Sequence, residues 1–257
     1  MYRPRVIPVL LLKNNGLVKS VKFKDYRYIG DPINAVKLFN DLGADELVFL
    51  DILATKEKRS ISLDFVRRVG DEANMPFSVG GGIKNLTEIQ QILSAGAEKV
   101  IINSFASENP GFIKEASGVF GSSTIVVSID TKKNLFGKEL IWSNSGSRSR
   151  VFDPVSFAKI MEDNGAGEII INSIERDGMM QGYDIPLIRK ISEAVRIPVV
   201  ALGGAGSNSD LRKAIFEGFA SAAAAGSLFV YHGPRRAVLV NFPLQVELIK
   251  LFDENSD

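Results

Sequence analysis

An internal repeat is the feature of this sequence that most restricts its fold. Residues 31–52 read DPINAVKLFNDLGADELVFLDI, and residues 153–174, which lie 122 positions later, read DPVSFAKIMEDNGAGEIIINSI. A unit of this length is much longer than a solenoid repeat, so it is a half-domain that has been duplicated and fused. We therefore expect one domain over 1–257, made of half-units at about 1–122 and 123–257. The identical pairs include Asp31/Asp153, Pro32/Pro154, Gly43/Gly165, Glu46/Glu168, Pro76/Pro198, Gly81/Gly203, Gly82/Gly204 and Gly96/Gly218.

Composition restricts the chemistry that the chain can perform. The 257 residues include no cysteine and one histidine, His232, which excludes a cysteine nucleophile and a multi-histidine metal site. We expect neither a metal nor a cofactor. The 31 basic and 30 acidic residues form no basic tract, so nucleic acid is not an expected partner. The apolar run near the N-terminus is too short for a membrane span and lacks a signal-peptide cleavage pattern, so we expect a cytoplasmic protein.

Short β-branched runs alternate with segments that have apolar residues at helical spacing. Eight strands with helices between them, in about 250 residues, are typical of a (β/α)8 TIM barrel. A doubly wound open sheet is the alternative, but a closed ring of eight divides naturally into two equal halves. The loop 131–152 is expected to contain a hairpin. Strands are predicted over 5–11, 46–51, 76–80, 98–103, 124–130, 168–173, 197–202 and 221–225.

Glycine-rich segments follow several of these predicted strands. In such barrels the active site lies at the C-terminal face, often with phosphate bound after strands 7 and 8. Backbone amides beside glycine can approach an anion closely, although the same glycines could simply form tight turns. Two matched clusters favour a substrate with a phosphate at each end. The clusters comprise Gly82, Asn103 and Ser104 in the first half, and Gly203, Gly204, Gly226 and Ser227 in the second.

Aspartates also stand at or near the ends of predicted strands. Asp31 and Asp153 precede prolines at the first position of helical segments, so they are expected to cap those helices. Asp51, Asp130 and Asp177 are candidates for acid–base work or for positioning substrate hydroxyls. Capping of the next helix is the structural alternative. Functional use is favoured for Asp130, because its position is central and Lys132 follows it.

Several motifs together resemble the HisF family along nearly the whole chain. They are DELVFLDI at 45–52, FSVGGGI at 77–83, IINS at 101–104, SID at 128–130, ERDG at 175–178 with GYD at 182–184, and GGAG at 203–206. HisF is the cyclase subunit of imidazole glycerol phosphate synthase, a lyase of histidine biosynthesis. The resemblance implies that a class I glutaminase (HisH-like) binds the N-terminal face of the barrel. Its ammonia would travel through the barrel to a bisphosphorylated ribulosyl substrate.

The resemblance also implies roles for individual residues. Asp130 corresponds to one of the two general acid/base aspartates, and Lys19 to the lysine of a mobile loop. The glycine clusters correspond to the phosphate-binding stretches. A charged gate for ammonia corresponds to Arg5, Glu46, Lys99 and Glu168, for which a plain salt-bridge network closing the barrel floor is the alternative.

One family position is not kept. The family has a C-L-D-V-K pattern at the end of the first strand, with an essential acid/base aspartate, whereas this chain has Val9-Leu10-Leu11-Leu12-Lys13. Leu11 cannot transfer a proton, and residues 6–19 contain no acidic side chain. Three readings stay open: a synthase subunit that tolerates Leu11, a paralogue that relays ammonia to another enzyme, such as one amidinating a sugar in surface-polysaccharide biosynthesis, or a non-catalytic activator of the glutaminase.

Overall fold

Eight parallel strands close into a barrel in the computed structural model, which describes residues 3–134, 136–149 and 152–253. Each strand pairs in parallel with the next in the series, and the last pairs with the first. The predicted (β/α)8 barrel is therefore confirmed, and the open-sheet alternative is wrong. In ring order the strands are β1 (Arg5–Lys13), β4 (Leu47–Asp51), β5 (Phe77–Gly80), β6 (Lys99–Ile102), β7 (Ile125–Lys133), β10 (Glu168–Ser173), β11 (Val199–Leu202) and β12 (Ala222–Ala225).

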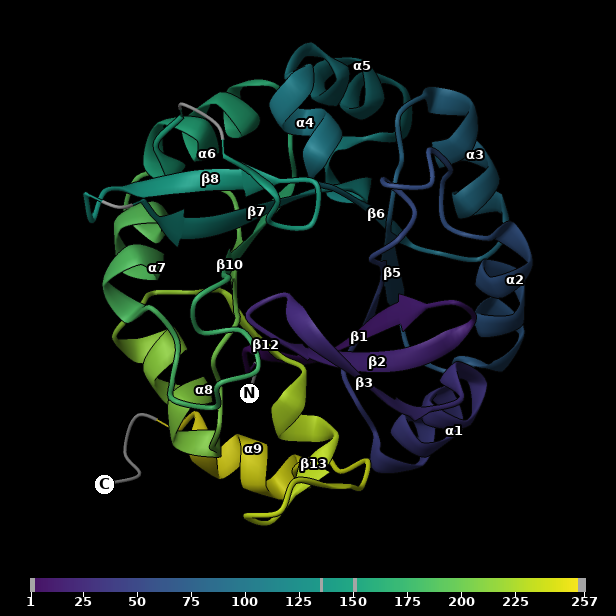
Figure 1. The fold of residues 1–257 in the computed structure, drawn as a ribbon, viewed down its shortest axis with the longest axis vertical. Helices are drawn as coiled ribbons and strands as arrows, with labels where there is room; N and C mark the ends of the chain where they lie inside the picture. Colours follow the sequence, from purple (N-terminus) through teal and green to yellow (C-terminus); the bar gives the residue numbers. More distant parts are fainter. Residues whose placement is uncertain (1–2, 135, 150–151, 254–257) are drawn as a thin grey trace.

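Helices surround the barrel in a ring (Figure 1). Asp31 accepts from the backbone N–H of Asn34 at the start of the first helix, and Asp153 accepts from those of Val155 and Ser156 at its repeat mate, which confirms both predicted caps. Within the described residues, no helix is long and apolar enough to cross a bilayer. The helices are α1 (Pro32–Leu42), α2 (Leu63–Glu72), α3 (Leu86–Ser94), α4 (Ser104–Glu108), α5 (Gly111–Phe120), α6 (Pro154–Asp163), α7 (Ile185–Ser192), α8 (Asn208–Phe216) and α9 (Gln245–Leu251), with 3₁₀ turns η1 (Ser122–Thr124) and η2 (Ser227–Phe229).

Two antiparallel hairpins lie over one opening of the barrel (Figure 1). The first consists of β2 (Gly16–Val21) and β3 (Lys24–Gly30), and the sequence patterns did not predict it. Its turn places Lys22 and Phe23 at positive φ, although neither residue type signals such a turn. The second pairs the end of β7 with β8 (Glu139–Ser143), which in turn pairs with β9 (Arg148–Ser149). This confirms the hairpin expected in 131–152, of which residues 135, 150 and 151 lie outside the described residues. A small third hairpin joins β13 (Tyr231–His232) and β14 (Ala237–Val238).

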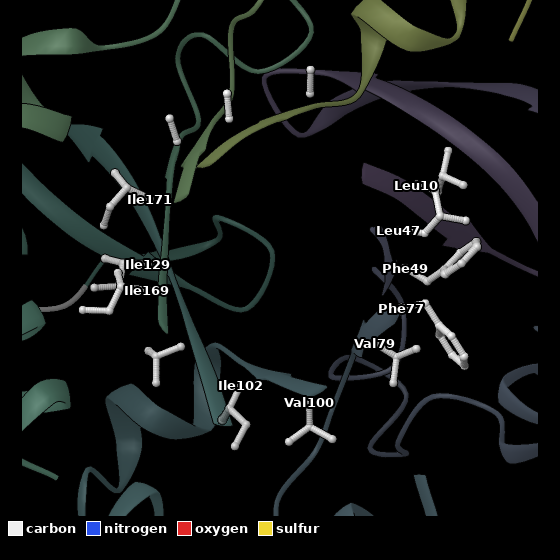
Figure 2. Close-up of a cluster of buried hydrophobic side chains, with 14 of the residues drawn as sticks. Leu10, Leu47, Phe49, Phe77, Val79, Val100, Ile102, Ile129, Ile169 and Ile171 are labelled. Atoms are coloured by element: carbon white, nitrogen blue, oxygen red, sulfur yellow. The ribbon is translucent and has the colours of Figure 1, made fainter. Parts of the chain in front are cut away.

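Side-chain alternation along the strands creates two separate apolar clusters. The outer cluster lies between the strands and the helices, and Figure 2 shows Leu10, Phe49, Val79 and Ile171 among its members around the barrel wall. The inner cluster fills the barrel itself. Its members are Ile7, Val9, Val48, Ile101, Val126, Ile170, Val200, Leu202, Ala222 and Ala224, with Leu50 packed against them. The four alanines of β12, which have poor strand propensity, are fully buried and contribute to both clusters.

The matched glycines Gly43 and Gly165 have similar φ angles but different neighbours. An added methyl group should therefore destabilise the two halves of the repeat to different extents. Both follow a helix with positive φ, 69° and 87°, a conformation that favours glycine. A methyl group at Gly43 would meet only Gln245 Nε2 at 3.8 Å, so Gly43→Ala should lower the free energy of unfolding by about 1 kcal/mol through backbone strain alone. At Gly165 the methyl would also overlap Ser117 Oγ, so Gly165→Ala should cost more.

Chemical denaturation of the two variants measures this difference. Ser117→Ala in the Gly165→Ala background should recover part of the extra loss, because it removes the overlapping hydroxyl. Equal losses for the two single variants would show that the overlap with Ser117 has no energetic cost.

Candidate functional site

A ring of four charged side chains closes the floor of the barrel. Arg5, Lys99 and Glu168 begin their strands, and Glu46 immediately precedes β4. The Arg5 guanidinium is bonded to both glutamates. Lys99 Nζ lies 2.8 Å from Glu168 Oε2 and 3.6 Å from Glu46 Oε2, and Ser78 Oγ donates to Glu46 Oε1 at 2.8 Å. The residues predicted for the ammonia gate therefore do come together in one ion-pair network, and their role as a gate stays a prediction.

The inner cluster lies directly above this floor ring. Within β10, Glu168, Ile170 and Asn172 share the interior face because successive side chains alternate. The interior thus passes from a charged floor through an apolar middle to a polar mouth. Moving an ion into an apolar layer requires much more free energy than moving a small neutral molecule into it.

A large pocket opens at the mouth, at the C-terminal ends of the strands. The β2–β3 hairpin covers part of it and contributes Lys19, Ser20, Phe23 and Tyr26. Every residue predicted for the upper site lines this pocket: Leu11, Lys19, Asp51, Gly82, Asn103, Ser104, Asp130, Asp177, Gly203, Gly204, Gly226 and Ser227.

Asp130 occupies the centre of the polar side of the mouth. Asn172 Nδ2 donates to its Oδ1 and Asn103 Nδ2 to its Oδ2, both at 3.0 Å. Burial raises the pKa of Asp130 to about 7, against the lowering effect of these two hydrogen bonds, and the charge of Asp177 raises it further. A carboxyl group with such a pKa can both give and take a proton near neutral pH.

Two details of the sequence interpretation around Asp130 were wrong. The strand does not end at Asp130, because β7 continues to Lys133 and pairs with β8. Lys132 therefore lies in the hairpin rather than in a loop with Asp130, and its Nζ is 5.0 Å from the centre of the Trp142 ring. The extension arises because the hairpin partner satisfies the backbone groups beyond the barrel wall.

Lys19 and Asp177 form the second charged group of the mouth. Lys19 is 5% exposed, and its Nζ donates to the carbonyl oxygen of Val9. Burial lowers the pKa of Lys19 to about 8, opposed by the charge of Asp177. Burial also raises the pKa of Asp177, although Ser20 Oγ donates to its carboxylate at 2.7 Å. A side chain at Gly226 would overlap Lys19 Nζ, so the amine lies directly beside a predicted phosphate loop.

The predicted phosphate loops differ in how their polar groups are used. The backbone N–H groups of Gly206 and Ser207 both donate to Asp210, which forms a capping box with Ser207 at the start of α8. In the other half, Ser104 Oγ accepts from the backbone N–H of Asn144 at 2.9 Å. The glycines allow close packing: a Cβ at Gly82 would overlap the carbonyl oxygen of Arg59, and one at Gly204 that of Gly182. Phosphate binding by these loops stays a prediction.

Asp51 has a structural role that competes with its predicted substrate-positioning role. Its carboxylate pairs with Arg59, and its Oδ1 accepts from the backbone N–H groups of Leu53 and Ala54 at 3.0 and 3.2 Å. These bonds close the loop that follows β4. Asp51 does not cap the next helix, as the structural alternative supposed, because Ser62 caps α2.

Leu11 faces the mouth from the strand opposite Asp130. It pairs with Val18 and Leu50, and it lines the pocket, whereas Leu10 and Leu12 on either side face the helices. Three strands separate β1 from β7 in each direction around the ring. The position that carries an acid/base aspartate in the HisF pattern is thus held by an apolar side chain in this chain.

Asn172 is the main site residue that the sequence interpretation missed. Its tetrapeptide IINS, at 170–173, repeats the IINS at 101–104 that contains Asn103. The two copies lie on β10 and near the end of β6, which flank β7, so both asparagines reach Asp130. That duplicated tetrapeptide was the available signal. Within the described residues, no group of three or more His, Cys, Asp or Glu side chains could hold a metal ion.

The raised pKa of Asp130 predicts a specific pH dependence of stability. A carboxyl whose folded-state pKa is raised binds its proton more tightly in the folded state, so the free energy of unfolding falls as pH rises from 3.8 to about 7. Asp130→Asn, which cannot ionise, should remove this fall. Denaturation across that pH window measures the slope, and Asp71→Asn, on the exposed face of α2, is the control. An unchanged slope in Asp130→Asn would contradict the assignment.

Comparison with known proteins identifies the family. The model of the histidine biosynthesis protein family matches residues 5–234. A protein of Alkaliphilus metalliredigens named imidazole glycerol phosphate synthase subunit HisF is 42% identical over 90% of this chain and 92% of its own length. Candidate subunits named HisF in Leptospira interrogans and hisF2 in Pseudomonas aeruginosa are 44% and 45% identical, over 98% and 95% of this chain and 100% and 97% of their own lengths. The chain therefore belongs to the histidine biosynthesis protein family, among its HisF members.

Proposed function

We propose that the chain is the HisF-like synthase subunit of a glutamine amidotransferase complex. A class I glutaminase binds the N-terminal face of the barrel, and its ammonia enters through the floor ring of Arg5, Glu46, Lys99 and Glu168. The ammonia crosses the apolar interior and meets an acceptor at the mouth. The acceptor is a bisphosphorylated, ribulosyl-type compound, which is what the resemblance to the HisF family implies.

One observation carries this proposal: three layers of suitable chemistry share a single axis. The charged floor ring, the inner apolar cluster and the pocket around Asp130 follow one another inside the same barrel. Neutral ammonia crosses an apolar interior at far lower cost than ammonium does. A plain salt-bridge floor explains the ring, but it does not explain a proton-exchanging carboxyl at the other end of the path.

Leu11 favours a second candidate function, in which the chain receives ammonia without performing the cyclisation. General acid–base catalysis by one group contributes about 10²- to 10⁴-fold to rate, and Leu11 removes one such group. The chain would then relay ammonia to another nitrogen-adding enzyme, such as one that amidinates a sugar in surface-polysaccharide biosynthesis. A purely non-catalytic activator of the glutaminase is less favoured, because Asp130 retains the two amide partners and the raised pKa of a proton carrier.

Restoring the missing carboxylate separates the two candidate functions. If the chain only relays ammonia, the wild type should form little or no imidazole glycerol phosphate from free ammonia and the bisphosphorylated ribulosyl substrate. Leu11→Asp should raise the rate by about tenfold or more, below the full 10²- to 10⁴-fold worth of such a group, because the surrounding Val18 and Leu50 are apolar. Product formation by wild type, Leu11→Asp and Leu11→Asp/Asp130→Asn is measured directly.

The double variant is the control, since a gain that depends on a carboxylate pair disappears when Asp130 is replaced. Robust turnover by the wild-type chain would show that Asp130 and Lys19 suffice, and the relay candidate would then fail.

Changing the floor ring tests the passage of ammonia. Lys99→Glu should lower nitrogen transfer from glutamine at least about tenfold and spare transfer from free ammonia, because a third carboxylate disrupts the closely paired charges. Lys99→Met, which keeps the length of the side chain, serves where charge reversal impairs folding. Lys190→Glu, the same charge change on the exposed face of α7, is the matched control. The assay compares both nitrogen sources in the presence of a co-purified class I glutaminase, and an equal response to all three variants would contradict the gate.

A further inference from the structure

The two asparagines that hold Asp130 are constrained to different degrees. Asn103 Nδ2 donates to Asp130 Oδ2 and to the carbonyl oxygen of Ser128, both at 3.0 Å, and Asn103 Oδ1 accepts from Ser104 Oγ at 3.3 Å. Asn172 Nδ2 donates to Asp130 Oδ1 at 3.0 Å, and among the described residues its buried Oδ1 has no hydrogen-bond partner. Both the nitrogen and the oxygen of the Asn103 amide are therefore hydrogen-bonded, whereas in Asn172 only the amide nitrogen is.

The fold places Asn172 beside Asp130. On the side of the Asn172 amide that faces away from Asp130 lies a glycine. The register of β7 and β10 pairs the two residues directly. Gly203 lies against the free edge of the amide, where a Cβ would overlap Asn172 Oδ1. An unpaired buried carbonyl oxygen is unfavourable, so its retention next to a titrating carboxyl calls for a physical reason.

The geometry points to Asn172 as a two-state positioning residue for Asp130. When Asp130 is ionised, Asn172 Nδ2 donates to the carboxylate, as observed. When Asp130 is protonated, a half-turn about the Cβ–Cγ bond of Asn172 presents Oδ1, which accepts the carboxyl O–H. The two ends of an asparagine amide have nearly the same shape, so this turn requires little additional space. Asn103 cannot do the same, because a half-turn would bring its Oδ1 against the carbonyl oxygen of Ser128, which has no proton to donate.

Asn172 therefore supplies a hydrogen bond to both protonation states of Asp130. A partner of this kind lets the carboxyl release and take up a proton without losing its orientation. The turn of the Asn172 amide does not depend on the proposed function. Only the use of the Asp130 proton in a reaction rests on that function. The other charged groups that face the mouth are Asp177 after β10, Lys19 on β2, Asp51 with Arg59 after β4, and Lys84 after β5. Their charges are the same in both asparagine variants described below.

Nuclear magnetic resonance of the purified chain with carbon-13-labelled aspartate tests the inference. Asn103→Leu should raise the proton affinity of Asp130 about tenfold, because it removes a donor to the carboxylate. Asn172→Leu should change it less than about threefold, because it removes a donor to the carboxylate and an acceptor from the carboxyl together. Equal tenfold rises in the two variants would show that Asn172 is a simple donor, and the inference would be overturned.

A second measurement needs no variant at position 172. In the wild-type chain, the side-chain amide signals of Asn172 should change with pH in step with the titration of Asp130, and Asp130→Asn should abolish that change. Constant Asn172 signals throughout the titration would overturn the inference. Neither measurement uses a glutaminase or a substrate. Evidence against nitrogen transfer would therefore leave the Asn172 inference standing, and evidence against the Asn172 turn would leave the proposed function standing.

Discussion

The closure of eight parallel strands is the constraint on which the remaining features depend. In a closed barrel, the alternation of side chains along each strand sends every second residue inward, so residues of equal height form layers. On β10 this places Glu168 in the floor ring, Ile170 in the apolar middle and Asn172 at the mouth. An open sheet of the same strands would spread these groups over a surface. Closure stacks them as successive layers inside one barrel.

The duplicated half-unit accounts for the scaffold but not for the asymmetry of the mouth. Repeat mates such as Asp31/Asp153 and Gly43/Gly165 perform the same tasks in both halves. The mouth instead places the buried carboxyl of Asp130 on β7 opposite the apolar side chain of Leu11 on β1. Burial raises the pKa of Asp130 to about 7, whereas a leucine carries no proton to exchange. The two sides of the mouth therefore differ in chemistry, although the two halves of the chain share one sequence pattern.

Much of the barrel could be predicted from the sequence because its signals are local. The run EIIINS predicted β10 at its observed bounds, and even the weak alanine strand near 222–225 was found through the repeat. The β2–β3 hairpin was missed because Lys22 and Phe23 adopt positive φ without a glycine or asparagine to signal the turn. Asn172 was missed because its partner Asp130 lies 42 residues earlier in the chain, and only the closed register brings them together.

The layers of the barrel interior differ in how closely they follow the HisF pattern. The floor ring contains two cations bonded to the same two glutamates, a network that by itself closes the barrel floor. The mouth retains Asp130, its two amide partners and the buried amine of Lys19. Leu11 lies inside that same mouth, so this departure from the HisF pattern concerns the pocket and leaves the floor ring and the apolar interior unchanged. Under the proposed function, replacing an acid/base carboxylate by leucine at this position would alter the reaction of the acceptor, whereas the entry of ammonia through the floor would be unaffected.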